Sequence, residues 1–197
     1  MWEAVYIIDG LLKNQSDMEP NTVHADTQGQ SLPVFALSHW LGIQLMPRIR
    51  NWKDLTFFRP RQDTVYQHID PLFDDPVNWE LRETHWQDLM RVVLSIKAGT
   101  VLPSTLLRKL GNNSRKNRLY RAFRELGRVV RTVFPLQDIS DMELREQIGA
   151  TTNKVEAYNG FSKWSFFGGE GIMAENDPEE QEKRIKYQDL VANIMIF

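Results

Sequence analysis

A strand, helix, strand pattern near the beginning of the chain constrains the fold more than any other feature of the sequence. Residues 22–25 form a short β-prone run that stops at the turn 26–30, and Ser31 follows in position to cap a helix. Apolar side chains recur along that helix at Leu32, Phe35, Leu37 and Leu41. Gly42 ends it, and residues 43–46 alternate as a second strand does. This pattern predicts an α/β sheet.

The pattern changes between residues 52 and 135, where helical periodicity dominates and no clear strand is visible. One apolar stripe at helical spacing consists of Trp86, Leu89, Val93 and Ile96. Pro103 and Gly111 bracket a short helix, and Asn113 or Ser114 is placed to cap the next one. We therefore predict that residues 51–136 form an all-helical insertion between residues 1–50 and 137–197, which together form the α/β core.

The last segment reads as two further helices. Ser140 and Glu143 have the spacing of a capping box and predict a helix from there to about residue 167. The glycine-rich turn 168–171 breaks it, and Asp177 then caps a final helix that starts with Pro178. The fold is therefore expected to be helix-dominated overall.

Charge is distributed unevenly along the chain. The formal net charge is −2, but nine basic residues and a single acid, Glu125, lie between Arg108 and Arg131, so this segment carries +8 and the remainder −10. Leu119, Phe123, Leu126, Val130 and Val133 predict one packed helix face, and Arg121, Arg124, Arg128 and Arg131 predict a cationic face roughly opposite. Bound phosphates would relieve the repulsion among these cations, which favours a polyanion site; a solvated helix face is the alternative.

The composition excludes several chemistries. With no cysteine, the chain can form no disulfide, thiolate metal site or cysteine nucleophile, and this fits a reducing cytosol. No run approaches the roughly 20 apolar residues that a membrane helix needs, so we expect a cytoplasmic protein without membrane contacts. The histidines His24, His39, His68 and His85 lack paired ligand spacing and are interpreted as core or surface residues.

Two carboxylates are the candidates for catalysis. Asp26 stands where the first predicted strand ends, a position at which α/β sheets gather ligands, although on spacing alone an Asx turn or a helix cap is the commoner explanation. Glu156 lies on a polar helical stripe with Thr152, Asn159 and Lys163, and a solvated helix face is the alternative there. If both bind a metal, such hard oxygen ligands suit Mg²⁺ or Mn²⁺ better than zinc.

Three stretches of the sequence resemble a known family, the catalytic (DDE) domain of the replicative class II transposases of the Tn-three type. The stretches are residues 24–29 (HADTQG), residues 35–50 with their PRIR ending, and above all residues 151–164 (TTNKVEAYNGFSKW). Together the resemblance covers nearly the whole chain. It implies an RNase H-like fold, of which this chain would hold a part, interrupted by a helical insertion.

The resemblance also implies a function, DNA transposition, in which the enzyme cleaves DNA strands and transfers them by two-metal phosphoryl transfer. Three acids of the family bind the metal ions; Asp26 matches the second and Glu156 the third, 130 residues later. The first acid is expected upstream of this chain, because Asp9 sits in a helical stretch and is no match. The implied partners are transposon ends, target DNA and a second transposase subunit, with association to the bacterial nucleoid through DNA.

Five residues near these acids are candidates for phosphate contacts: Arg48, Arg50, Lys154, Asn159 and Lys163. Both ends of the chain are apolar and lack capping signals, so we expect a piece of a longer protein whose activity is incomplete alone. The alternatives are a fragment that binds DNA without chemistry and a decayed transposase remnant that folds poorly.

Overall fold

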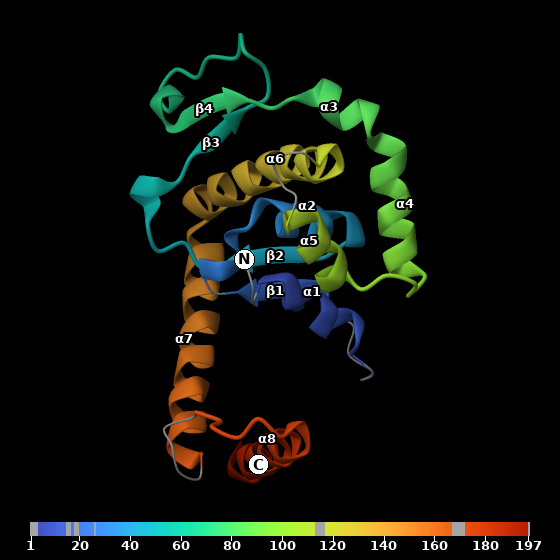
Figure 1. Cartoon of the computed structure of the whole chain (residues 1–197). Coiled ribbons are helices and arrows are strands. Elements are labelled where there is room, and N and C mark those ends of the chain that lie inside the picture. The colour runs from blue at the N-terminus through green and yellow to red at the C-terminus, as the bar shows by residue number, and fades with distance from the viewer. Residues whose placement is uncertain are drawn as a thin grey trace. The chain divides into compact units, whose positions relative to one another are not determined.

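The computed structural model describes residues 4–14, 17, 20–25, 27–112, 117–166 and 172–196. It forms two compact units, residues 1–149 and 150–197, and each is described by itself (Figure 1). The helices are α1 (Ala4–Leu12), α2 (Leu32–Leu41), α3 (Trp79–Thr84), α4 (Trp86–Lys97), α5 (Pro103–Asn112), α6 (Arg118–Ser140), α7 (Met142–Ser165) and α8 (Pro178–Ile196). The strands are β1 (Thr22–Ala25), β2 (Gln44–Pro47), β3 (Phe57–Arg59) and β4 (Phe73–Pro76), with short 3₁₀ helices η1 (Thr27–Gln30), η2 (Trp52–Asp54) and η3 (Asp70–Leu72).

The predicted strand, helix, strand unit is confirmed. β1 and β2 pair in parallel, with Thr22 opposite Gln44 and Ala25 opposite Pro47, and α2 connects them. Gly42 ends α2 in the left-handed conformation (φ 81°), which glycine adopts without a steric penalty. The second strand begins and ends one residue later than the sequence indicated.

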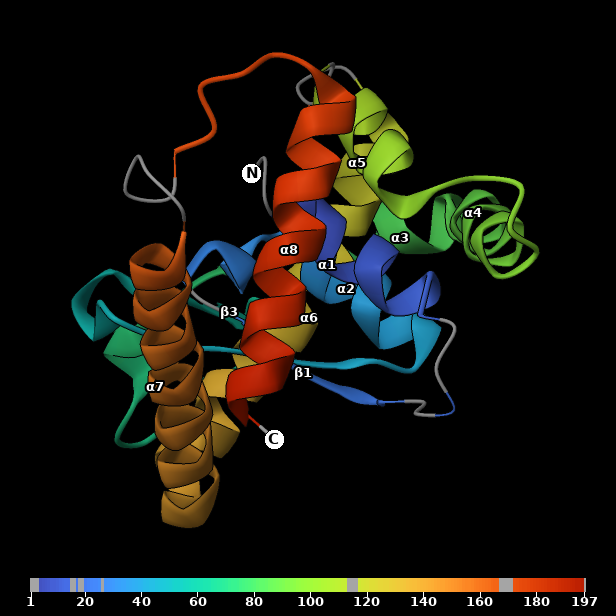
Figure 2. The same ribbon diagram turned by 90° about the horizontal axis from the view of Figure 1, so that it is seen from below.

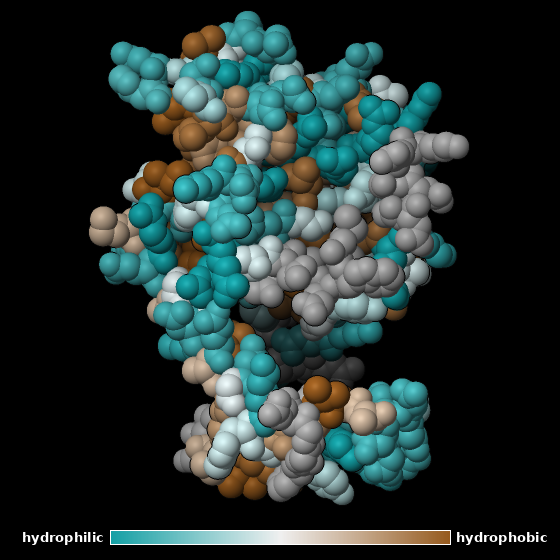
Figure 3. Space-filling view, turned by 60° about the vertical axis from the view of Figure 1, so that its left-hand side comes forward, coloured by the Kyte–Doolittle hydropathy of each residue, from teal (hydrophilic) through white to brown (hydrophobic). Residues whose placement is uncertain are grey.

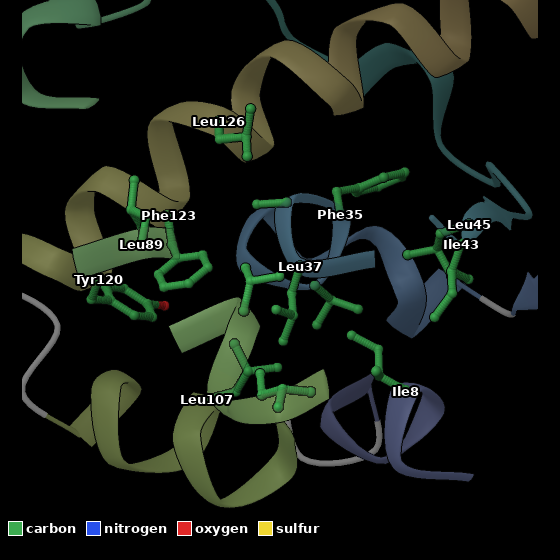
Figure 4. Close-up of a cluster of buried hydrophobic side chains, with 14 of the residues drawn as sticks. Ile8, Phe35, Leu37, Ile43, Leu45, Leu89, Leu107, Tyr120, Phe123 and Leu126 are labelled. Carbon is green, nitrogen blue, oxygen red and sulfur yellow. The ribbon is translucent and has the colours of Figure 1, made fainter. Parts of the chain in front are cut away.

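The core of the first unit gathers apolar side chains from six helices, including Ile148 of α7, and one strand. In Figure 4 the labelled side chains point toward one another from α1, α2, α4, α5, α6 and the region of β2. The labelled members are Ile8, Phe35, Leu37, Ile43, Leu45, Leu89, Leu107, Tyr120, Phe123 and Leu126. Phe35, Phe123 and Leu89 are fully buried, and so are Ile8 and Leu107, so five helices reach the centre of this core.

The packing of α2 on α6 depends on Gly127, in the middle of α6. A Cβ atom added at Gly127 would lie 2.0 Å from the carbonyl oxygen of Leu32 and 2.5 Å from its carbonyl carbon. No side chain fits in that space, and real Cβ contacts are never this short. The absence of a side chain at position 127 therefore brings the first turn of α2 against the backbone of α6.

The prediction that residues 51–136 contain only helices is wrong. β3 and β4 pair in parallel, with Phe57 opposite Phe73, and they lie beside α6 (Figures 1 and 2). Each strand is only three or four residues long, and polar residues such as Asp74 and Asp75 mask any alternation. Contacts between residues far apart in the sequence hold the two strands in place. The Phe58 N–H donates to Thr132 Oγ1 of α6 at 3.0 Å, and the rings of Phe57 and Phe73 meet edge to face.

Two predicted helix caps are also corrected. The N-cap of α6 is Asn117, whose Oδ1 accepts from the Tyr120 N–H at 3.1 Å, whereas Asn113 and Ser114 lie outside the described residues. At the start of α7 the capping oxygen belongs to Asp141, which accepts from the Leu144 N–H at 3.0 Å. Ser140 instead ends α6, because that helix continues through Pro135 for five more residues. The predicted boundary at 136/137 thus falls inside α6.

The second unit contains the later part of α7 together with α8. Asp177 caps α8 as predicted, its Oδ1 accepting from the Glu179 N–H at 2.9 Å. Gln188 of α8 is buried, and its side-chain amide donates to the hydroxyl of Ser165 at the end of α7. This hydrogen bond joins the two helices of the unit.

Hydrophilic side chains cover much of the face seen in Figure 3, where apolar side chains occur in small patches between them. Among the described residues, no helix combines the length and the apolar character that crossing a membrane requires.

Asp9 of α1 is buried and caps a different helix. Its Oδ1 accepts from the Ser104 N–H at 2.9 Å, and its Oδ2 accepts from the Ser104 hydroxyl. Ser104 lies in the first turn of α5, where N–H groups lack partners within the helix and the helix dipole favours a negative charge. Asp9 therefore fastens α5 to α1.

Replacing Asp9 with alanine is expected to lower the free energy of unfolding by about 2–3 kcal/mol, because it leaves two buried donors of Ser104 without an acceptor. Urea unfolding followed by circular dichroism measures the change. Asp63→Ala, at an exposed turn, is the control and should stay within about 0.5 kcal/mol of the parent. Equal stabilities of the two variants would show that Asp9 does not fasten α5.

Candidate active site

The carboxyl end of β1 is the first candidate location for chemistry. Asp26 itself lies outside the described residues, but Ala25 before it ends β1 and Thr27 after it begins η1. Gly29 of η1 is buried, and a Cβ atom there would come within 2.7 Å of the Ala25 Cβ and 3.2 Å of the Pro47 Cβ. The helix η1, which follows position 26, therefore packs closely against the ends of both strands.

The exit of β2 is tied to the same end of the sheet. The Arg48 N–H donates to the Ala25 carbonyl oxygen at 2.9 Å, and the Gln30 side-chain amide donates to the Arg48 carbonyl oxygen at 3.1 Å. Arg48 is half-buried and Arg50 exposed. The structure therefore brings Arg48, one of the predicted phosphate contacts, to the strand end that leads into position 26.

A shallow, open cavity of about 400 Å³ lies beside this strand end. Its lining comes from η1, from the first turn of α2 and from the beginning of α6: Thr27, Gln30, Ser31, Leu32, Pro33, Tyr120 and Arg124. Burial raises the pKa of the Tyr120 hydroxyl, and the nearby charge of Arg124 opposes that rise. The cavity thus places a cationic side chain of α6 next to the residue that follows Asp26.

A larger groove of about 700 Å³ lies elsewhere in the first unit, along α2, β2 and α6. Apolar side chains such as Phe35, Val130 and Phe134 make up much of its wall. Size alone does not indicate chemistry, and the smaller cavity is the better candidate because it adjoins the end of β1.

The four arginines of α6 do not form the single cationic face that we expected. Arg121 and Arg124 are exposed, whereas Arg128 and Arg131 are half-buried. The Arg128 guanidinium lies 3.4 Å from Glu125 Oε2 and 4.7 Å from the centre of the Phe58 ring. The reason is that β3 packs on this side of α6, a contact between segments far apart in the sequence.

The predicted residues of α7 belong to the second unit. Glu156, Lys154, Asn159 and Lys163 are all exposed, and Glu156 takes part in interactions of its own. Three aromatic rings follow on the same helix, with ring centres 6.4 Å apart from Tyr158 to Phe161 and 6.0 Å apart from Phe161 to Trp164. The proximity of Glu156 to position 26 stays a prediction.

The histidines take different places. Burial lowers the pKa of His24 in β1, while His39 and His68 are exposed and His85 lies 3.6 Å from Asp88. In the part of the chain that the structure describes, no three histidine or acidic side chains come together as a metal site.

Sequence reasoning missed three residues that shape this region: Gly29, Glu125 and Gly127. Glu125 is buried and accepts from the Asn78 N–H at 2.9 Å, which holds the segment after β4 against α6. The sequence does mark two of the three as unusual: Glu125 is the single acid of a basic segment, and Gly127 interrupts a strongly helical pattern. No local signal distinguished Gly29 from an ordinary turn glycine.

Comparison with known proteins agrees with the resemblance in the sequence. The family model of the Tn3 transposase DDE domain matches residues 1–197. The transposases of transposon Tn21 from Escherichia coli and of transposon Tn501 from Pseudomonas aeruginosa are each 37% identical over 194 residues, which is 98% of this chain and 20% of each relative. The transposase of transposon Tn1546 from Enterococcus faecium is 34% identical over 191 residues.

The chain spans about a fifth of the length of these curated relatives. Because the family model matches the whole chain, the assignment covers both units and does not depend on the short motifs alone. The protein belongs to the Tn3 transposase DDE domain family.

Proposed function

We propose that this chain is part of the catalytic centre of a transposase that cleaves DNA at transposon ends and joins the released 3′ ends to target DNA. The observation that carries the proposal is the arrangement at the carboxyl end of β1. There the residues on both sides of Asp26, the exit of β2 with Arg48 and the cavity with Arg124 come together. Acids and cations at one strand end are what phosphoryl transfer on a polyanion requires.

The β1, α2, β2 unit fits one part of an RNase H-like sheet, and α7 fits the later helix that carries the last acid. In this assignment Asp26 and Glu156 are the second and third acids of the family's catalytic set. The parallel pairing of β1 and β2 and the helical content of the rest support it. A further acid would have to be supplied by the remainder of the full-length protein.

The donor chemistry fits a divalent metal ion. Asp26 and Glu156 offer carboxylate oxygens, the ligands that Mg²⁺ and Mn²⁺ prefer, and the chain has no cysteine that would favour zinc. When bound, two such ions stabilise the attacking and leaving oxygens at the reacting phosphate. The two side chains would hold the metal and carry no proton themselves.

The basic side chains would position the DNA backbone. The candidates are Arg48 and Arg50 after β2, the arginines Arg121, Arg124 and Arg131 of α6, and Lys154, Asn159 and Lys163 of α7. Arg128 is left out, because it already faces Glu125 and the Phe58 ring. Two transposon ends must be joined in one event, so we propose a homodimer that acts on DNA in the cytoplasm at the nucleoid.

The test uses the full-length transposase that contains this chain and a plasmid carrying the two transposon ends. Strand transfer should require a divalent ion, so removal of metal with EDTA should abolish it and added Mg²⁺ or Mn²⁺ should restore it. Added Ca²⁺ should not restore strand transfer, because Ca²⁺ favours looser coordination. Strand transfer at full rate in EDTA would rule the proposal out. DNA binding that persists without any cleavage in the presence of Mg²⁺ would favour the alternative, a module that binds DNA without chemistry.

A further inference from the structure

Two arginines of α6, Arg124 and Arg131, have no counterion among the described residues. Among the described residues, Arg59 pairs with Asp70, Arg91 with Asp88, Arg128 with Glu125 and Arg145 with Asp138. The side chains of Arg124 and Arg131, like those of Arg118 and Arg121 on the same helix, make no hydrogen bond or ion pair in the part of the chain that the structure describes.

Arg131 is the more unusual of the two. It is half-buried, and its Nε is shielded from solvent without a hydrogen-bond acceptor. Desolvation by this burial lowers the pKa of the guanidinium. A charge that loses its hydration and gains no partner destabilises the folded state. An anion bound beside the guanidinium would offset this cost.

The two arginines flank one point of the fold. They are seven residues apart on α6, which is two helical turns or about 10 Å. Gly127 lies between them and touches the backbone of Leu32, so the first turn of α2 meets α6 in the interval. Arg124 also lines the cavity beside this contact, so its positive charge lies close to the first turn of α2.

The described lining of the cavity offers hydrogen-bond donors. Thr27 and Ser31 contribute hydroxyl groups, and the Gln30 amide, which also donates to the Arg48 carbonyl oxygen, has a second N–H; the described lining contains no aspartate or glutamate. The Ser31 side chain stands at the N-cap of α2 without making the capping hydrogen bond. Such a set of groups suits a phosphate.

We propose that this cavity binds a phosphate of the DNA backbone, with Arg124 in the cavity and Arg131 two turns along α6 as the cationic contacts. The proposal rests on the proposed function only in taking DNA as the polyanion. Because Thr27 lines the cavity and follows Asp26 directly, the bound phosphate is a near neighbour of the one that reacts. Arg128 contributes nothing to this site, although it belongs to the same basic segment.

The test measures the affinity of the chain for a duplex of 30 base pairs at several salt concentrations, by fluorescence anisotropy. Arg124→Gln and Arg131→Gln should each lower the slope of log affinity against log salt by about 0.9, which is about an eightfold loss at 0.1 M salt. Arg91→Gln removes the same charge from α4 and should leave affinity within about twofold. Thermal melting supplies the second readout, on the same variants.

Melting separates a ligand contact from a structural role. Arg131→Gln should melt at the same or a higher temperature than the parent, and 50 mM inorganic phosphate should raise its melting temperature less than that of the parent. Arg128→Gln should melt lower, because it leaves the buried Glu125 without its counterion.

Two outcomes would overturn the inference: unchanged salt slopes for Arg124→Gln and Arg131→Gln while the parent chain binds DNA, or a lower melting temperature for Arg131→Gln with its slope intact. A parent chain that shows no salt-dependent affinity for DNA would instead count against the proposed function itself, and so the two failures are distinguishable.

Discussion

Asp26→Asn and Glu156→Gln, made separately in the full-length transposase, are each expected to lower the rate of strand transfer by about a thousandfold or more. Each substitution keeps the size of the side chain and removes the charge that would hold a divalent ion. Losing a metal ligand withdraws several kcal/mol from the transition state, and each 1.4 kcal/mol corresponds to a factor of ten. Joining of a pre-cleaved transposon end to target plasmid measures the rate.

The matched controls are acids of the same types outside the proposed centre. Asp63→Asn, in an exposed turn, and Glu146→Gln, on the exposed part of α7, should transfer strands within about twofold of the parent. Affinity for transposon-end DNA should stay close to that of the parent in all four variants, since phosphate contacts, not these acids, supply it. Normal strand transfer by Asp26→Asn or Glu156→Gln would remove that residue from the catalytic set.

The parts of the fold that the sequence predicted are those with local causes. β1, α2 and β2 follow from alternation, a helical stripe and Gly42, each of which acts within a few residues. Asp177 was identified as a cap for the same reason. Asp141 was missed because it lies next to Ser140, and one residue of helix decides which of the two side chains reaches the N–H of the first turn.

The parts that the sequence did not predict depend on distant contacts. β3 and β4 are held by Thr132 and by the meeting of Phe57 with Phe73, over separations that no window of residues covers. The burial of Arg128 and Arg131 follows from the same packing. A helical wheel places the arginines on one side of α6 but does not show that a second sheet covers part of that side.

The candidate site also has one part that the sequence indicated and one that depends on contacts between distant residues. Spacing alone left Asp26 and Glu156 no better than a turn residue and a solvated helix residue, and the resemblance to a family made them catalytic candidates. The placement of Arg124 beside the end of β1, in contrast, required the close contact of α2 with α6. That contact exists because position 127 has no side chain.

Gly127→Ala is expected to destabilise the first unit by about 3 kcal/mol or more. The added methyl group would lie 2.0 Å from the Leu32 carbonyl oxygen, and backbone on both sides prevents a small local adjustment. The helices must then separate, which loosens the burial of Phe35 and Phe123 as well. Urea unfolding measures the loss, and DNA affinity at 0.1 M salt should fall with it, because the cavity beside Arg124 is built on this contact.

Gly149→Ala is the matched control, since Gly149 is also a helical glycine of the first unit but has no atom within 4 Å of the added methyl group. There the substitution should stabilise the protein by about 1 kcal/mol, the difference in helix propensity between alanine and glycine. The two variants carry the same chemical change and the same gain in helix propensity. Stability changes of opposite sign would therefore isolate the effect of the steric clash at position 127. If Gly127→Ala were as stable as Gly149→Ala, α2 would not rest on the backbone of α6, and the origin of the cavity at the end of β1 would have to be sought elsewhere.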